Sequence, residues 1–583
     1  MTRTRIVFFA IVAVAFFIIL ATLIVRGIAG LVADNGPAAD GNTTQATPLP
    51  RDTVLLTVSS SNTKEKWLNQ IVERFNAEGH QTAAGDTIIV EATHVTSGGS
   101  MEAILNGRSQ PVAWSPGDQS WVDQLNQNWQ QRENKPLISQ SCRPTIYAPL
   151  GFAMWQPMAE TLGWPDRPVG WETIVGLAAD PNGWASYGRP EWGEFRFGHT
   201  HPGYANSGLL AMTSFVHGVL LTNEPLTAAQ VYQAEGAMRA LEQNTAKYGR
   251  QSPDILDLMA RQGPSYLHAA AVPEADVVRF NDERGDELQF PLAFIFPAGG
   301  TIWADHPYCI LDNADWVSEA QAEAAAIFAD YLGARPQQEV AIDNYLRPTD
   351  TTIPLHAPLD LEHGTDPTIS PAQIPALPSP DASVSEAVID LFLITKRKAT
   401  IVVVLDVSGS MQGDKIKSAT AATVEFLGRL YPDDELAVIT FNDDVVTLAD
   451  PRRVGDVVET LSDRVGTLVA DGNTALYGAV CEAAALAEQL KAEDEAAGES
   501  RLYGIVLLSD GEDTVGDPTE TRMFATCLPE TAEAEGIKIF PIAFGEDADA
   551  EVLSRIASVT GGNLYTANPE SISNVYVSIS AEQ

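Results

Sequence analysis

The sequence predicts an α/β protein with two globular regions, the second of which is a doubly wound parallel sheet. Short apolar runs of strand length alternate with amphipathic stretches of helix length from residue 53 onward, which is typical of α/β domains. Residues 399–405 form a near-continuous apolar run, as expected for a parallel strand buried on both faces. Two stretches rich in Pro or in small polar residues, 30–52 and 348–380, lie outside the globular regions.

The first 29 residues are predicted to form a signal anchor. Arg3 and Arg5 precede an apolar run over residues 6–25 that only Thr22 interrupts. About 20 apolar residues span a bilayer as a helix, whereas the core of a cleavable signal is shorter. No small-x-small cleavage site directly follows the run, so we expect an uncleaved, single-pass transmembrane helix. The early arginines place the N-terminus in the cytoplasm and the domains outside it, at the cell membrane, although Arg26 opposes this orientation.

The composition excludes some partners. The chain has 583 residues, of which 45% are hydrophobic, so it can bury more than one core. Its formal net charge of −41 argues against nucleic acid, because the phosphate backbone requires Lys and Arg. The same charge is compatible with a surface that attracts divalent cations, or with solubility alone.

The chain order after the anchor is a tether, a middle domain, a linker and a last domain. Residues 30–52 are predicted to be a flexible tether. The middle domain covers residues 53–347, with a strand at 53–59, a helix at 64–76 and a strand at 87–92. Residues 348–397 are a Pro-rich linker that ends in a short helix, 383–393.

The last domain covers residues 398–583 and alternates strands with helices. Such alternation indicates a doubly wound sheet, which binds ligands beyond the carboxyl ends of its strands. The strand candidates are 399–405, 436–441, 502–508, 538–542 and 563–566, and the helix candidates are 415–430, 475–490, 520–535, 550–559 and 571–580.

Oxygen-bearing side chains lie in three loops at this predicted edge. Asp406, Ser408 and Ser410 follow the first strand of the last domain, Asp510 follows the third, and Thr474 directly precedes a helix. Each piece alone also occurs by chance or as a simple turn, but their order and placement together favour a metal site. Carboxylate and hydroxyl oxygens suit Mg²⁺, with Mn²⁺ or Ca²⁺ as alternatives. A site with so few carboxylates stays electrophilic, so a partner's Glu or Asp can complete it.

The stretches 403–411, 472–477 and 508–513 resemble the metal-ion-dependent adhesion site of the von Willebrand factor A family, and the resemblance covers residues 398–583. It implies a Rossmann-like fold and a metal-dependent ligand site. The family's ligand roles correspond to Asp406, Ser408, Ser410, Thr474 and Asp510, some of them through water. Asn473 stands where a second glycine is common, which is a mild departure.

The stretches 59–61, 66–68, 75–76, 97–100, 112–116, 163–165, 192–193, 206–208 and 305–308 resemble bacterial extracellular solute-binding proteins. This resemblance implies a periplasmic-binding-protein-like (type 2) α/β fold and a small solute. Helix N-termini with Ser hydroxyls bind anions, which makes an anion the candidate solute, but the same serines are equally expected as ordinary helix N-caps. The candidate solute contacts are Ser59, Ser60, Ser97, Ser100, Tyr147 and Ser207.

Four cysteines allow three pairings, or none if all four are buried thiols. Right-handed crossovers place helices 475–490 and 520–535 parallel on one face of the sheet. Cys481 and Cys527 both fall in the second turn of these helices, so we predict that they pair. Cys142 and Cys309 then pair in the middle domain.

The sequence favours a non-enzymatic surface receptor, with one module for a solute and one for a protein partner that offers an acidic residue to the metal. A first alternative is the substrate-binding component of a transporter, docked through the last domain. A second is a metal-dependent hydrolase. The sequence has no Gly-x-Ser-x-Gly, Walker or His-Glu-x-x-His motif, so we expect no enzymatic activity.

Overall fold

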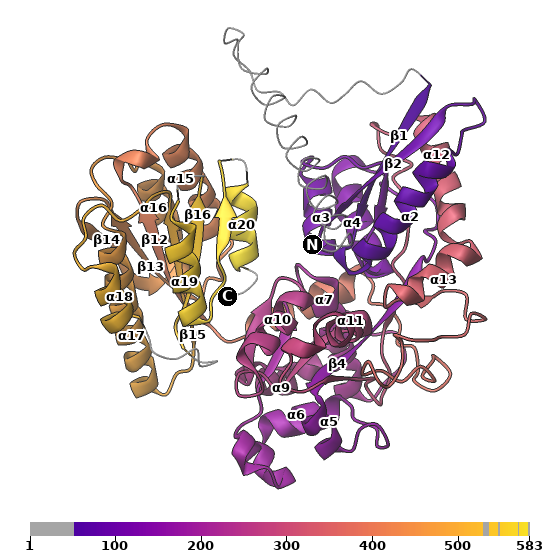
Figure 1. Ribbon diagram of the computed structural model, residues 1–583, viewed down its shortest axis with the longest axis horizontal. Coiled ribbons are helices and arrows are strands. Elements are labelled where there is room, and N and C mark those ends of the chain that lie inside the picture. The colour runs from indigo at the N-terminus through magenta and orange to yellow at the C-terminus, as the bar shows by residue number, and fades with distance from the viewer. Residues whose placement is uncertain (1–51, 529–535, 546–547, 570, 581–583) are drawn as a thin grey trace, which may run out of the picture. The chain divides into compact units, whose positions relative to one another are not determined.

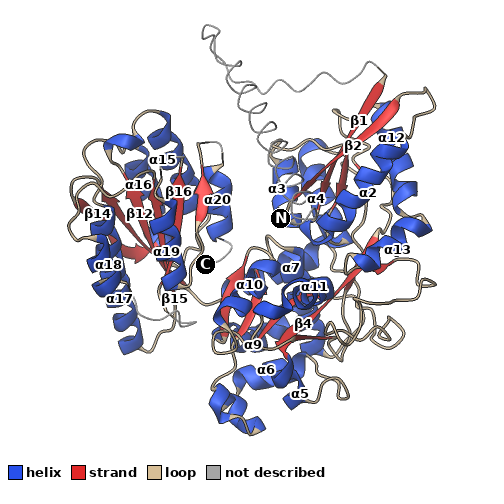
Figure 2. Ribbon diagram, viewed as in Figure 1, coloured by secondary structure: helices blue, strands red, loops and turns tan. Residues whose placement is uncertain are grey.

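The computed structural model describes residues 52–528, 536–545, 548–569 and 571–580. The described part contains three β-sheets, each flanked by helices (Figures 1 and 2). The predicted transmembrane segment and nearly all of the tether lie outside the described residues. Within them, no helix combines the length and the apolar character that crossing a membrane requires.

The first sheet builds one lobe of the middle domain, called lobe 1. Its strand order is β10-β3-β1-β2, with β10 antiparallel to β3 and the other pairs parallel. Trp67, Phe75 and Phe328 lie fully buried in its core. The strands are β1 (Thr53–Ser60), β2 (Thr87–His94), β3 (Ala113–Ser115) and β10 (Cys309–Ile310), and the helices are α2 (Glu65–Glu78), α3 (Ser97–Leu105), α4 (Gln119–Glu133), α12 (Glu319–Leu332) and α13 (Arg335–Asp343).

The second sheet builds lobe 2, with the order β11-β4-β7-β5-β6, and with β8 and β9 also paired to β4. The chain passes into lobe 2 after α4, returns to lobe 1 at β10, and reaches lobe 2 again at β11. The strands are β4 (Ile146–Trp155), β5 (Phe197–Thr200), β6 (Thr245–Gly249), β7 (Ala269–Pro273), β8 (Leu292–Ile295), β9 (Trp303–Ala304) and β11 (Arg347–Pro348), and the helices are α5 (Gln156–Leu162), α6 (Trp171–Ala179), α7 (Asn206–Leu220), α8 (Ala228–Val231), α9 (Glu235–Gln243), α10 (Ser252–Gln262) and α11 (Glu274–Arg284).

The predicted linker packs on the middle domain. Thr301 and Ala376 form a parallel bridge, and Leu377 is buried beside Leu150. Arg347 of β11, which forms a buried ion pair with Glu274, also donates from Nη2 to the Asp366 carbonyl of the linker at 3.2 Å. The short helix predicted at 383–393 is α14 (Ala382–Thr395), capped by the Asp381 carboxylate, which accepts the Val384 N–H.

The third sheet has the order β14-β13-β12-β15-β16-β17, and only β14 is antiparallel. One face is covered by α15, α16 and α20 and the other by α17, α18 and α19, so this is a doubly wound sheet. β14 and α16 were not among the predicted elements. The strands are β12 (Ala399–Asp406), β13 (Glu435–Phe441), β14 (Val445–Arg453), β15 (Leu502–Ser509), β16 (Lys538–Phe544) and β17 (Tyr565–Ala567), and the helices are α15 (Asp414–Leu427), α16 (Val454–Gly466), α17 (Leu476–Ala497), α18 (Glu520–Thr526), α19 (Ala550–Thr560) and α20 (Ile572–Ser580).

Both predicted disulfides are present. Cys481 in α17 pairs with Cys527 at the C-terminal end of α18, with 4.9 Å between the Cα atoms. Cys142 pairs with Cys309, which ties the segment before β4 to β10. The described part of the helix predicted at 520–535 ends at Thr526, and residues 529–535 lie outside the described residues.

Candidate functional site

The carboxyl edge of the third sheet brings four of the five predicted metal ligands into contact with one another. Asp406 is the last residue of β12, and its Oδ1 accepts the Ser408 backbone N–H at 2.9 Å. Ser408 Oγ lies 2.9 Å from Ser410 Oγ, which donates to Asp510 Oδ1 at 2.7 Å. The strands β12 and β15 are paired in parallel, so their carboxyl ends bring Asp406 and Asp510 to one edge.

The loop that carries the fifth predicted ligand, Thr474, lies against the first loop. The Gly409 N–H donates to the Gly472 carbonyl at 2.9 Å. A side chain at Gly409 would place its Cβ only 3.1 Å from that carbonyl oxygen, and Gly472 has a φ of +84°, so both glycines allow the approach. The Thr474 N–H donates to Thr514 Oγ1 at 2.8 Å, and this hydrogen bond positions Thr474 just before α17.

The edge combines two buried carboxylates with one nearby cation. Asp406 and Asp510 are at most 1% exposed, and Lys415 Nζ donates to Asp510 Oδ2 at 2.6 Å. Burial, and to a smaller extent the neighbouring Asp510, raises the pKa of Asp406, against the effect of its hydrogen bonds. An all-oxygen donor set with one uncompensated negative charge fits a hard divalent cation. No cluster of three or more His, Cys, Asp and Glu side chains that could hold an ion occurs in the described part of the chain.

Sequence reasoning did not identify two participants at this edge. Ser509, fully buried at the end of β15, donates its hydroxyl to Asp406 Oδ2 at 2.7 Å. Lys415 lies in the first turn of α15. The position of Ser509 directly before Asp510 at a strand end was a usable signal, whereas the contact of Lys415 depends on how α15 packs.

The six candidate solute contacts differ in their burial and in their partners within the protein. Ser59 and Ser60 end β1 and are buried. Three other serines are engaged within the protein: Ser97 Oγ accepts the Gly117 N–H at 2.9 Å, Ser100 Oγ accepts from Trp114 Nε1 at 3.0 Å, and Ser207 Oγ lies 2.7 Å from Thr200 Oγ1. Tyr147 is half-buried on β4, with its ring edge-on to Trp303.

A buried lysine that the sequence did not single out joins three loops of lobe 1. Lys64 is 1% exposed, and its Nζ lies 3.1 Å from Ser61 Oγ, 2.9 Å from the Ser115 carbonyl and 3.3 Å from His306 Nδ1. Burial holds the pKa of Lys64 well below its ordinary value, and burial likewise lowers that of His306. The pKa of the neighbouring Asp305 is raised to about 7, chiefly by burial and then by Asp118.

The two lobes meet at the N-termini of α3 and α7. The Gly98 N–H in α3 donates to the Tyr204 carbonyl of lobe 2 at 3.1 Å. A Cβ at Gly98 would lie 2.5 Å from the Gly203 carbonyl oxygen, so only glycine permits this approach. Across the same junction, Trp121 Nε1 of α4 donates to Asn206 Oδ1 at 2.9 Å. The two lobes are therefore in direct contact at this junction.

Comparison with known proteins identifies both modules. The family model of the bacterial extracellular solute-binding protein matches residues 56–347, just over half of the chain, and that of the von Willebrand factor type A domain matches residues 400–576. Inter-alpha-trypsin inhibitor heavy chain H4 of Bos taurus is 31% identical over 165 residues, which are 28% of this chain and 18% of that relative. The chain thus spans less than a fifth of the length of this relative.

Two solved structures illustrate the likeness. The periplasmic binding protein AfuA from Actinobacillus pleuropneumoniae aligns with 59% of this chain and 99% of its own, at 12% identity and a TM-score of 0.41. A von Willebrand factor type A protein from Catenulispora acidiphila aligns with 32% of this chain and 42% of its own, at 20% identity and a TM-score of 0.28. On the evidence of the family models, the chain belongs to the bacterial extracellular solute-binding proteins and carries a von Willebrand factor type A domain in its C-terminal third.

Proposed function

We propose that this chain is a non-enzymatic, extracytoplasmic receptor anchored in the cell membrane, in which the C-terminal domain binds a protein partner through a metal ion. The observation that carries the proposal is the contiguous oxygen cluster of Asp406, Ser408, Ser410 and Asp510 at the sheet edge. Asp406, Ser408, Ser410, Thr474 and Asp510 would hold Mg²⁺, with Mn²⁺ or Ca²⁺ as alternatives. The bound ion would supply an electrophilic site for one further anionic ligand.

The charge at the edge supports a ligand that arrives from outside. Lys415 offsets one of the two buried carboxylates, so a divalent ion leaves the site with excess positive charge. A carboxylate from a partner's Glu or Asp satisfies both that charge and the open coordination position. The middle domain supplies the solute-binding capacity, since its family binds solutes. An anion is the proposed class because the N-termini of α3 and α7, one from each lobe, lie at the junction of the lobes, and helix N-termini bind anions.

Membrane anchoring rests on the apolar run of residues 6–25 and on the arginines before it. This topology places both modules in the compartment where solute-binding proteins meet their solutes, and where two disulfides are stable.

Capture of partners by the purified full-length protein tests the proposal. Wild-type protein should retain a partner in Mg²⁺ and release it in EDTA, and Asp406→Ala should retain none in either condition. Asp414→Asn removes a 90% exposed carboxylate close by in the chain, so it should behave as wild type. Equal capture by wild type and Asp406→Ala would rule out metal-dependent recognition.

The two-lobed domain also favours a second candidate function, the substrate-binding component of a transporter. This alternative predicts a permease encoded beside the gene and loss of solute uptake on its deletion. A phosphatase assay of the purified protein with Mg²⁺ tests the hydrolase alternative, and we expect no turnover above the buffer rate.

A further inference from the structure

The helix α14, which lies beyond the residues matched by the solute-binding family model, bridges the two lobes of the middle domain. It packs against α4 of lobe 1 and against α7, α8 and α9 of lobe 2. Val384, Val388, Leu391 and Phe392 are at most 2% exposed and belong to the same apolar core as Trp121 of α4. A helix buried against both lobes resists their separation, because moving the lobes apart would expose one apolar side of α14 to water.

The two ends of α14 are fastened to different lobes. Just before the helix, Ser379 Oγ donates to Asp118 Oδ2 at 2.8 Å, and Asp118 is the N-cap of α4 in lobe 1. Just after it, the Arg397 N–H donates to the Tyr248 hydroxyl at 3.3 Å, and that hydroxyl donates to the buried Glu242 at 2.7 Å in lobe 2.

The later turns of α14 contact the loop of lobe 2 that carries Gly203 and Tyr204 and touches lobe 1. The Phe392 ring lies 4.9 Å from the His201 ring in an edge-on contact, and Ile389 borders Gly203. The next residue, Tyr204, presents the carbonyl that accepts the Gly98 N–H of α3. Through this loop, the position of α14 is linked to the contact between the lobes.

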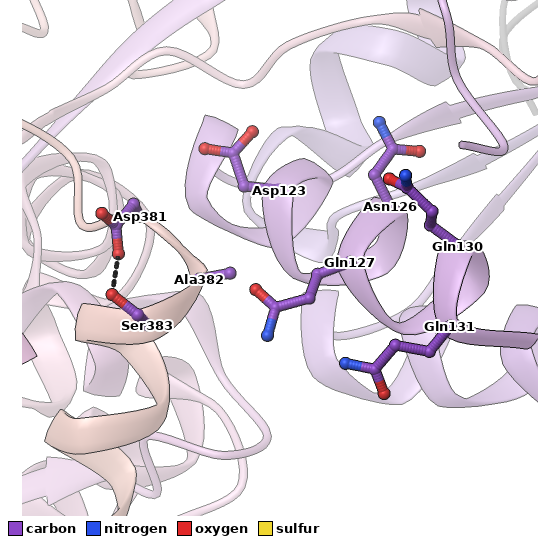
Figure 3. Close-up of a pocket in the computed structure, with 8 residues that line it drawn as sticks. All are labelled: Asp123, Asn126, Gln127, Gln130, Gln131, Asp381, Ala382 and Ser383. Atoms are coloured by element: carbon purple, nitrogen blue, oxygen red, sulfur yellow. Dashed lines mark hydrogen bonds between the residues drawn. The ribbon is translucent and has the colours of Figure 1, made fainter. Parts of the chain in front are cut away.

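The packing of α14 against α4 differs along the length of the helix. Between its first turn and α4 lies an open groove of about 710 Å³ with a polar lining (Figure 3). Asp123 and Asp381 carry like charges across this groove, and their interaction is one cause of the raised pKa of Asp123, after burial. The N-terminal turn therefore has a polar, like-charged groove on one side, beside Asp381 and Ser383, although Val384 in the same turn is buried in the core. The lining residues are Asp123, Asn126, Gln127, Gln130, Gln131, Asp381, Ala382 and Ser383.

We propose that α14 is a clasp that holds the lobes of the solute-binding module closed, and that opening releases its N-terminal turns from α4 while the later turns stay on lobe 2. Only Lys396, Arg397 and Lys398 separate α14 from β12, the strand that ends at Asp406. The clasp is thus adjacent in the chain to the strand that carries the candidate metal site. The proposal rests on the two-lobed fold and does not depend on metal or partner binding.

Hydrogen exchange of the full-length protein, followed by mass spectrometry on the peptide spanning residues 96–101, tests the clasp. This peptide contains the Gly98 amide and lies in lobe 1. The double variant Val384→Ser/Val388→Ser should speed its exchange by about tenfold, as expected for a sub-global opening. Glu386→Gln, on the exposed face of the same helix, should leave it unchanged.

Ser379→Ala is a second variant that removes only the tie to Asp118, so it preserves the core if the double variant fails to fold. It should speed exchange at residues 96–101 in the same direction by a smaller factor. Faster exchange within α14 itself, with no change at residues 96–101 in either variant, would overturn the proposal. Because no ion, solute or partner is added, this result is independent of the capture experiment above.

Discussion

Asp406 and Asp510 are chemically alike and buried to the same extent, yet their neighbours differ. Asp510 forms an ion pair with Lys415 at 2.6 Å, whereas the hydrogen-bond donors to Asp406 among the described residues are neutral groups of Ser408 and Ser509. The charge of Asp406 is therefore the less compensated of the two. A divalent ion at this edge should depend on Asp406 more than on any single hydroxyl, because a hydroxyl contributes no net charge.

Replacing Asp406 with Ala should abolish the stabilisation that Mg²⁺ confers on the C-terminal domain. For wild type this is about 2.7 kcal/mol at a hundredfold excess of ion over its dissociation constant. Ser408→Ala should reduce the effect without removing it, and Asp414→Asn should leave it intact. Thermal unfolding with and without Mg²⁺ measures the increment separately from any change in basal stability. If Mg²⁺ stabilised the Asp406→Ala protein as much as the wild type, this aspartate would be excluded as a ligand of the ion.

His268 should make the middle domain sensitive to acid. It is 1% exposed, and its Nδ1 accepts the Trp184 indole N–H at 3.1 Å and the Arg196 N–H at 3.0 Å. Burial, and then the charge of Arg196, lowers its pKa to about 3. The folded state thus keeps the ring neutral, while the unfolded chain takes up a proton near pH 6.5. The contribution of neutral His268 to the unfolding free energy is therefore fully present above about pH 6.5 and is lost as the pH falls toward 3.

Between pH 7 and pH 5 this group alone should remove about 2 kcal/mol of unfolding free energy. His268→Gln offers an amide oxygen to the same donors but does not titrate, so it should lose about 2 kcal/mol less over that interval. His356→Gln, at an exposed position, serves as the control. Denaturant unfolding at both pH values gives the two differences, and an equal loss in wild type and His268→Gln would contradict the assignment.

At the scale of elements, α17 and α18 are joined covalently across one face of the third sheet. The Cys481–Cys527 bridge closes a loop of 46 residues. By the chain-entropy relation, its removal should cost about 4 kcal/mol of unfolding free energy. Cys481→Ser/Cys527→Ser should therefore lower the unfolding midpoint of the C-terminal domain. Cys142→Ser/Cys309→Ser should instead lower that of the middle domain, and calorimetry on both double variants tells the transitions apart.

The sequence predicted some elements, such as β12, but not others, such as β14. β12 is buried at every position, and its near-continuous apolar run predicted both the strand and its end at Asp406. β14 is an edge strand with no buried residue along its length, so it has no apolar alternation to detect. A strand at the edge of a sheet can be held by backbone hydrogen bonds alone, which side-chain patterns do not report.

At the scale of the whole molecule, the sequence predicts one orientation across the membrane. Protease treatment of intact cells should remove the C-terminal domain, because the apolar run and its preceding arginines predict that both modules lie outside the cytoplasm. Alkaline carbonate should leave the chain with the membrane pellet. Deleting residues 6–25 should move the protein to the soluble fraction in the same extraction. Complete protection in intact cells that is lost on lysis would show the opposite orientation.

Features that depend on neighbours in sequence were predicted by the sequence itself. Among them are the alternation of strands and helices, the end of β12 at Asp406, and the pairing of Cys481 with Cys527. These features follow from helix and strand periods and from the right-handed crossover, all of which act over short stretches of chain.

Only the tertiary structure decided which partners the small polar side chains take. Ser100 is bound by Trp114, and Lys64 lies among Ser61, Ser115 and His306. The sequence also left α14 as the end of a linker, whereas the structure buries it between two lobes. A serine has one short side chain and several possible partners, and a helix has one apolar face and several possible surfaces. Which of these is used depends on segments that are distant in the chain and adjacent only after folding.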